Sequence, residues 1–232
     1  MRSETKPRYH HGALERALVD EAVRQVRERG AEQVSLRGLA QTIGVSPSAA
    51  YQHFPDKAAL LAAVCAAVGD ELGALMQGAV DAVEDDGEAG AVGRFLAVGR
   101  AYVTFALAQP HLFRHMFGPA GAEAGTRVAL DERRELPGHD EPYAILLARI
   151  AELSEHGLLR PGVADDPVLD VFAWALVHGF SSLAIEGHLP AEVGEPLLVL
   201  FGRMVLTEEA FATFEKALAG QRGAVAGQPV GR

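Results

Sequence analysis

The sequence predicts an all-α protein built from two helical parts. Along most of its 232 residues, apolar side chains recur at spacings of three and four, and stretches that alternate with period two are few. Alanine is abundant and β-branched residues are sparse, which favours helices over strands. We expect a first domain at residues 1–62, a larger second domain at 63–220 and a disordered tail at 221–232.

The composition argues against several classes of protein. Apolar types make up 49% of the chain and charged types 22%, which argues against wholesale disorder. The uncharged stretch Val171–Ile185 is too short to span a bilayer, and the basic N-terminus lacks the apolar segment of a secretory signal. Cys65 is the only cysteine, so an internal disulfide is excluded. We therefore expect a cytoplasmic protein with no membrane partner.

The first helix is expected over Gly12–Arg29, where apolar and charged faces separate. Leu14, Leu18 and Val26 recur at helical spacing on one face, and charged residues lie away from it. Gly30 follows directly and is expected to end the helix, because glycine readily adopts the left-handed conformation found there.

Two short helices joined by a tight turn come next. Ser35 can cap a helix over Leu36–Ile43, and residues 44–46 form a turn that begins with glycine. A third helix over residues 47–54 starts with a serine cap and a proline at its first position, where no N–H is needed. The dipeptide Pro55-Asp56 is expected to end it and to cap the next helix.

The rest of the chain is predicted to be helical, with loops at 84–87 and 118–141. The second loop is rich in glycine and could hold one helical turn around residues 128–134. The expected helices are Lys57–Val83, Ala89–Ala108, Pro110–Phe117, Pro142–His156, Pro167–Glu186 and Glu195–Ala219.

The pair of short helices predicts a helix-turn-helix, in which the second helix presents its N-terminal residues to the major groove of DNA. Charge agrees with this interpretation. Residues 1–60 carry nine Lys/Arg against seven Asp/Glu, whereas the remainder carries twelve against twenty-four. The acidic second part disfavours a non-specific architectural DNA protein, because it would repel long tracts of DNA.

The motifs SLRGLAQTIGVS at 35–46 and YQHF at 51–54, with Lys57 after them, resemble the TetR/AcrR family of regulators. With the first helix, the resemblance covers roughly residues 10–62. It implies contacts to bases from the start and middle of the second short helix, and contacts to phosphates from residues around it. The implied DNA-binding residues are Ser35, Arg37, Ser46, Pro47, Ser48, Tyr51, Gln52, His53 and Lys57.

The recognition helix departs from the common family pattern at residues 48–50, which read Ser-Ala-Ala where Gly-Thr-Leu is more usual. These small side chains leave direct reading of bases mainly to Ser48 and Gln52, and Gln52 could pair with adenine. The basic residues Arg2, Lys6 and Arg8 could form an arm over the DNA backbone or minor groove, or belong to a disordered terminus. Phe54 is expected to be core.

The segment FAWALVHGFSSLAIEG at 172–187 resembles the C-terminal domain of a TetR subgroup named for a Trp-His-Gly motif. A mostly apolar pocket with a few polar groups would suit a small hydrophobic effector. The alternative for each such residue is ordinary core packing. The candidate pocket residues are Tyr102, Phe105, Phe113, Met116, Phe117, Trp174 and His178.

Two C-terminal helices are apolar on more than one face and must be buried on more than one face. They are the helix around Trp174 and the one that contains Phe201 and Met204. A symmetric four-helix interface between two copies satisfies this pattern, and the family resemblance implies the same homodimer. The expected partners are therefore a palindromic DNA operator, a small effector and a second copy.

No catalytic or cofactor motif emerges from the sequence. His111 and His115 lie four residues apart on one helical face, but zinc needs further ligands that the sequence does not indicate. We expect no enzyme, no cofactor and no metal, and the function expected is that of a DNA-binding transcriptional regulator, a repressor released by its effector. The alternative is a small helical enzyme or sensor whose helix-turn-helix serves only for packing.

Overall fold

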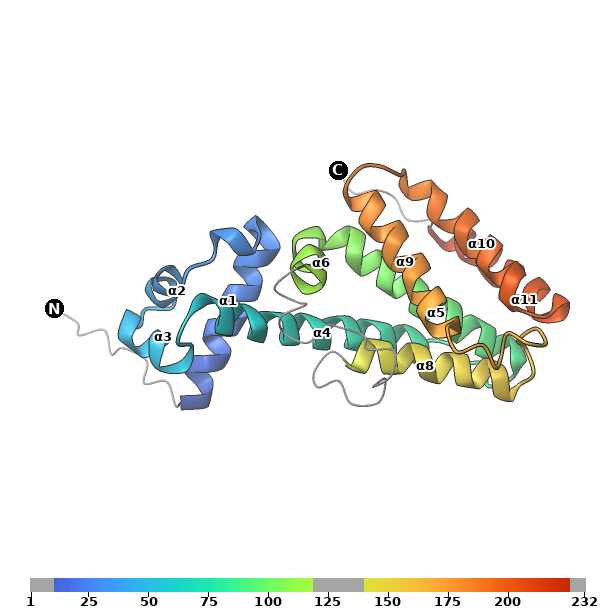
Figure 1. Cartoon of the computed structure of the whole chain (residues 1–232), viewed down its shortest axis with the longest axis horizontal. Coiled ribbons are helices and arrows are strands. Elements are labelled where there is room, and N and C mark those ends of the chain that lie inside the picture. The colour runs from blue at the N-terminus through green and yellow to red at the C-terminus, as the bar shows by residue number, and fades with distance from the viewer. Residues whose placement is uncertain (1–10, 119–139, 226–232) are drawn as a thin grey trace. The chain divides into compact units, whose positions relative to one another are not determined.

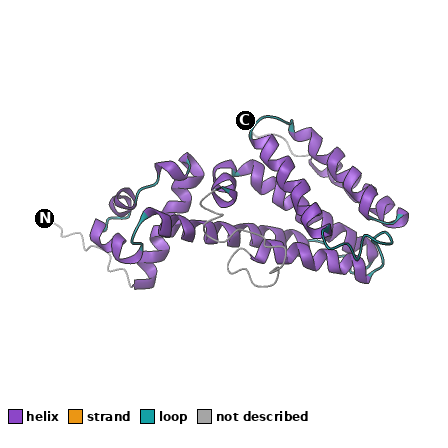
Figure 2. Cartoon of the chain, viewed as in Figure 1, coloured by secondary structure: helices purple, strands orange, loops and turns teal. Residues whose placement is uncertain are grey.

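The computed structural model describes residues 11–118 and 140–225. Within these residues the regular structure is helical, apart from one isolated bridge pair, and the predicted all-α class is confirmed (Figure 2). Figure 1 labels the α-helices. In chain order the helices are α1 (His11–Arg29), η1 (Ala31–Gln33), α2 (Leu36–Thr42), α3 (Pro47–His53), α4 (Lys57–Asp81), α5 (Glu88–Ala108), α6 (Pro110–Phe117), α8 (Asp140–Glu155), α9 (Leu169–Ile185), η2 (Ala191–Val193), α10 (Gly194–Val205) and α11 (Glu208–Val225).

Most predicted helix bounds agree with the observed ones to within two residues. The expected apolar face of α1 is buried, with Leu18 and Val26 fully enclosed. Asp56 caps α4 as predicted, since its Oδ1 accepts the Ala59 N–H at 2.8 Å. The helical turn expected around residues 128–134 lies outside the described residues.

The single helix predicted over 195–219 is wrong, because the structure has two helices there. The chain leaves α10 at Leu206, which forms an antiparallel bridge with Leu159. Thr207 then caps α11 by accepting the Ala210 N–H at 3.3 Å. Helix α11 also continues to Val225, past the expected start of the tail, while residues 226–232 lie outside the described residues.

The described residues form two compact units. The first contains residues 11–71 together with 108–118 and 140–141, and the second contains 72–107 together with 142–225. Helix α4 therefore has residues in both units, and α6 belongs to the first.

The first unit is built around α1. Leu18, Leu39 and Leu60 are fully buried and come from α1, α2 and α4. Helix α6 packs on α1 and contributes the buried Leu112. A bidentate ion pair also joins α1 to α4, with Arg27 Nη2 at 2.8 and 2.7 Å from the two carboxylate oxygens of Glu71. These contacts fix the support on which the two short helices lie.

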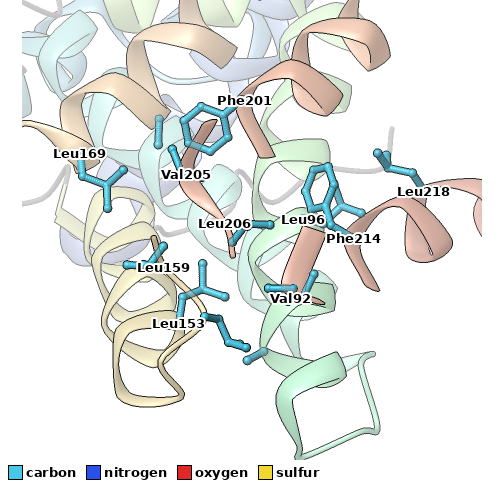
Figure 3. Packing of buried hydrophobic residues seen from close by; sticks show 14 residues of the cluster. Val92, Leu96, Leu153, Leu159, Leu169, Phe201, Val205, Leu206, Phe214 and Leu218 are labelled. Carbon is cyan, nitrogen blue, oxygen red and sulfur yellow. The ribbon is translucent and has the colours of Figure 1, made fainter. Parts of the chain in front are cut away.

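The second unit has its own core, shown in Figure 3. Its helices α5, α8, α9, α10 and α11 each contribute buried apolar side chains. Beside this core, Arg94 donates to Glu152 Oε1 at 2.6 Å and to the Asp85 carbonyl at 2.6 Å, which joins α5 to α8 and to the preceding loop. The labelled core residues in Figure 3 are Val92, Leu96, Leu153, Leu159, Leu169, Phe201, Val205, Leu206, Phe214 and Leu218.

Helices α4 and α5 are long and apolar enough to cross a membrane by length and composition. About half of each apolar window is buried, 50% in α4 and 56% in α5. Buried side chains such as Val68 and Leu96 identify these helices as core helices, which pass the same test.

Candidate functional site

The turn between α2 and α3 has a fixed geometry because two backbone hydrogen bonds close it. The N–H of Val45 donates to the Ala40 carbonyl at 2.9 Å, and the N–H of Gly44 donates to the Gln41 carbonyl at 3.3 Å. Gly44 has a φ of 79°, the left-handed conformation that this kind of helix ending requires. The predicted turn glycine is therefore confirmed in its role.

Both short helices start with the serine caps that the sequence predicts. Ser35 Oγ accepts the Gly38 N–H at 3.1 Å, and Ser46 Oγ accepts the Ala49 N–H at 3.2 Å. A cap contributes about 1 kcal/mol to the stability of a helix. That contribution matters here because helices of seven residues are not stable on their own in water.

Packing on one side of the pair directs α3. Leu36, Leu39 and Ala50 are buried, and Phe54 is 6% exposed, which confirms the expectation that Phe54 is core. The opposite side of α3 consequently faces outward. Pro47, Ser48, Tyr51 and Gln52 are all exposed there.

Tyr51 is 51% exposed although it is a large aromatic residue. A hydroxyl beside polar side chains on an exposed helix suits hydrogen bonds to phosphate and base edges. Arg37 on α2 is exposed as well and forms no ion pair within the described residues. By contrast, Arg24 is held by Glu21 and Glu28, so its charge is already compensated.

Lys57 and His53 lie at the junction of α3 and α4, and both contact protein groups. Lys57 Nζ donates to the Glu32 carbonyl at 2.9 Å, which ties the start of α4 to η1. An ammonium group has three donors, so two remain for other acceptors. The His53 side chain is only 8% exposed, and its Nδ1 lies 3.6 Å from a carboxylate oxygen of Glu15. Little of this ring is accessible to a phosphate.

In the second unit, three of the predicted pocket residues form a hydrogen-bonded line. Trp174 Nε1 donates to Tyr102 Oη at 3.3 Å, and Tyr102 Oη lies 2.9 Å from His178 Nδ1. The phenol oxygen accepts from Trp174, and its proton is directed to His178 in the tautomer whose Nδ1 carries no hydrogen. Burial lowers the pKa of His178 and raises the pKa of Tyr102, which keeps both groups uncharged.

A further aromatic contact extends this line. The Tyr143 ring meets the Trp174 ring edge-on at 6.2 Å, and Tyr143 Oη donates to Asp170 Oδ2 at 2.6 Å. Sequence reasoning missed Tyr143 and Asp170. Both stand at or near the start of a predicted helix, which gave no signal that they would pair.

The other four predicted pocket residues divide between the units. Phe105 is buried in the second unit, whereas Phe113, Met116 and Phe117 are on α6 in the first. The rings of Phe113 and Phe117 pack at 4.9 Å from each other.

A pocket of about 170 Å³ opens in the second unit between α5, α9 and the start of α10. None of the seven predicted pocket residues lines it. Its lining includes Arg100, Thr104 and Glu195, which the sequence pattern did not single out.

The two histidines of α6 have separate surroundings. His115 is buried, with Nε2 3.0 Å from the Leu61 carbonyl and 3.3 Å from Cys65 Sγ. His111 is exposed and its ring lies near Gly30. Within the described residues no group of three possible metal ligands is present. Burial lowers the pKa of His115 and raises the pKa of Cys65 to about 11, so the thiol stays protonated.

The fold and the exposed α3 face define a protein with a helix-turn-helix in its first unit and a second, helical unit. Family models agree with both parts. The model described as "Bacterial regulatory proteins, tetR family" matches residues 18–64, and the model described as "Tetracyclin repressor-like, C-terminal domain" matches residues 95–219. The chain belongs to the TetR family of bacterial transcriptional regulators.

Solved structures share the fold of this chain. A protein with unknown function from Rhodococcus sp. RHA1 is 30% identical, with a TM-score of 0.65 over 86% of this chain and 98% of that one. A putative TetR-family regulator from Mesorhizobium loti MAFF303099 is 19% identical, with a TM-score of 0.58 over 91% and 98%. RolR in complex with resorcinol is 16% identical, with a TM-score of 0.59 over 96% and 97%. No curated protein matches the sequence.

Proposed function

We propose that this chain is a cytoplasmic, homodimeric repressor that binds a palindromic operator and is released from it by a small hydrophobic effector. The observation that carries the DNA-binding part is the outward face of α3, where Ser48, Tyr51 and Gln52 are exposed, together with Arg37 on α2, which is exposed and forms no ion pair within the described part of the chain. In this proposal Ser48 and Gln52 read bases, and Arg37, Tyr51 and Lys57 contact phosphates.

The same exposure argues against a small enzyme or sensor that uses its helix-turn-helix only for packing. A pair of helices that served only for packing would not need an exposed tyrosine and glutamine on the recognition helix. A gel shift of the purified protein with DNA from upstream of its own gene separates the two interpretations. A shift that unlabelled random DNA fails to compete away supports the repressor, and the absence of any preference supports the enzyme or sensor.

A second copy is proposed to cover the apolar side chains that α9 and α10 leave exposed. Leu200 and Met204 on α10 are 54% and 53% exposed, and Phe172 and Leu183 on α9 are also exposed. Exposed apolar side chains grouped on neighbouring helices mark interaction surfaces. In a two-fold dimer the two α3 helices would meet half-sites about 34–36 Å apart.

The proposed effector acts near the line of Trp174, Tyr102 and His178. Neutral hydrogen-bonding groups among aromatic rings suit a mostly apolar ligand with a few polar atoms. RolR, which has the same fold, binds resorcinol. Trp174 is the only tryptophan, so its emission reports this region directly. An effector must change Trp174 emission and weaken operator binding over the same concentration range, because the two equilibria are linked.

The effector test uses the full-length protein, a labelled operator and a set of small aromatic compounds. A compound that binds the protein without changing operator affinity is not the effector. If many apolar compounds leave both Trp174 emission and operator affinity unchanged, release by a hydrophobic effector is excluded for this chain.

A further inference from the structure

The pocket between α5, α9 and α10 is a second feature of the larger unit, separate from the line of Trp174, Tyr102 and His178. Much of its lining is apolar and includes side chains such as Leu176, Phe180 and Leu198. The pocket volume is about 170 Å³. A dry cavity of about 150 Å³ is known to hold one benzene ring, so this pocket matches one ring with a small substituent.

The lining also carries groups of opposite hydrogen-bonding character. Arg100 on α5 offers only donors, Glu195 on α10 offers only acceptors, and the Thr104 hydroxyl can do both. A guanidinium has five N–H groups and a carboxylate has about four lone-pair positions, so each can bind a ligand in addition to its contacts with the protein.

The charges select the ligand. An anionic group would be attracted by Arg100 and repelled by Glu195, and a cationic group would meet the reverse. A neutral hydroxyl can accept from the guanidinium and donate to the carboxylate at the same time. We propose that this pocket binds a neutral, hydroxyl-bearing molecule of about one ring, with the ring against the apolar side chains and the hydroxyl in contact with Arg100 and Glu195.

The wall formed by Phe180 depends on a glycine. A Cβ added at Gly194 would lie 2.8 Å from two atoms of the Phe180 ring, closer than side chains tolerate. The absence of a side chain at Gly194 therefore lets the ring lie against the backbone at the start of α10. Any side chain there would push the ring and reshape the pocket.

The first test compares four probes of similar size by ligand-observed NMR on the full chain without DNA. The probes are phenol, cyclohexanol, benzoate and benzylamine at pH 7. Phenol and cyclohexanol should bind with a Kd of about 0.1–1 mM, a range set by the small number of atoms in each ligand. The two ionised probes should bind about tenfold more weakly or not at all. Equal or tighter binding of an ionised probe, or no binding of either neutral probe at 10 mM, about ten times the expected upper Kd, overturns the proposal.

The second test removes one charge from the pocket and measures how the preference between benzoate and phenol changes. Glu195→Gln should raise the affinity of benzoate relative to phenol by about tenfold, because the repulsion ends while Arg100 remains. The control is Glu192→Gln, a surface glutamate on η2 that does not line the pocket, and it should leave the ratio unchanged. An unchanged ratio in Glu195→Gln, or an equal change in the control, contradicts the assignment.

A third variant tests whether phenol binds in this pocket or elsewhere in the unit. Val177→Phe should fill the space and abolish phenol binding, while far-UV circular dichroism confirms that the helices persist. If that variant does not fold, the Glu195→Gln ratio still decides. All three experiments omit DNA. A negative result therefore contradicts only the proposed ligand of this pocket and not operator binding by α3, and a failure to bind an operator would not contradict the proposed ligand.

Discussion

Helices α3 and α10 both leave large side chains exposed, but the exposed chemistry is opposite. Helix α3 exposes Tyr51 and Gln52, which can form hydrogen bonds. Helix α10 exposes Leu200 and Met204, which cannot. The two surfaces therefore suit different partners, a polar and charged one for α3 and an apolar one for α10.

The two regions also differ in what holds them in place. Local signals define α2 and α3, namely two serine caps, a left-handed glycine and a proline at the first position of α3. Helices α9 and α10 have no side-chain cap hydrogen bond at their starts, and packing in the core of their unit positions them. Substitutions of exposed residues in the first region should change binding with little change in stability. In the second region, substitutions of buried residues should strongly destabilise the unit, whereas substitutions of exposed residues should leave its stability nearly unchanged.

The largest expected effect is that of Phe201→Asp. Phe201 is 4% exposed and packs with Phe95 and Phe172, at ring distances of 6.0 and 5.2 Å. It belongs to the core of its own unit, although its sequence pattern alone also allowed a place at the interface between copies. Burying an unpaired carboxylate in that core and losing the ring should cost more than about 4 kcal/mol. Circular dichroism should show the loss of cooperative unfolding, and a variant that melts like the wild type would refute the core assignment.

Met204→Asp, three residues further along α10, should act on assembly instead. Met204 is 53% exposed, so a carboxylate there stays solvated in the monomer and should change monomer stability by less than about 0.5 kcal/mol. In the proposed dimer, one such charge from each copy would be buried at the interface without a partner, which is strongly unfavourable. Light scattering should report a folded monomer with weakened operator binding. A variant that remains dimeric at micromolar concentration places the interface elsewhere.

Lys57→Met should have an intermediate effect on DNA binding. The loss of one phosphate contact should weaken all operator sequences alike and reduce the slope of log affinity against log salt by about one. It also removes the bond to the Glu32 carbonyl, worth about 1 kcal/mol of stability. Lys216→Met, at an exposed position on α11, serves as the control. If affinity and slope match those of the control while stability falls, Lys57 is only a structural tie.

Much of the first unit could be predicted from the sequence because its signals are local. The cap at Ser35, the turn at Gly44 and the cap at Asp56 each occupy a few consecutive residues. The break between α10 and α11 escaped prediction because Leu206 is as apolar as its neighbours. Its strand-like conformation depends on pairing with Leu159, which is distant in sequence.

For the candidate sites too, the sequence could indicate local features but not contacts between residues distant in sequence. The exposure of Tyr51 and Gln52 follows from the helical period and the buried side of α3, so the sequence could indicate it. The contact of Lys57 with Glu32, and the line from Trp174 through Tyr102 to His178, join residues that only the tertiary fold brings together. A list of aromatic residues could name members of that line but not distinguish them from Phe113, which is in the other unit.

The smallest expected effect concerns the dependence of stability on pH. Burial lowers the pKa of His178 in the folded protein, so the unfolded chain binds more protons as the pH falls below the ordinary histidine value of about 6.5. The contribution of the neutral imidazole is therefore fully present above that pH and is lost as the pH falls toward the folded-state pKa. His178→Gln removes this titration and should flatten the fall in stability between about pH 7.5 and 5.5. The variant also weakens the hydrogen bond with Tyr102, which should lower stability at pH 7.5 by about 1 kcal/mol.

His188→Gln, at an exposed position after α9, is the matched control and should keep the wild-type slope. Urea unfolding at each pH measures the difference. An identical slope in all three proteins would mean that folding leaves the pKa of His178 unshifted, which contradicts a buried imidazole held neutral by its surroundings.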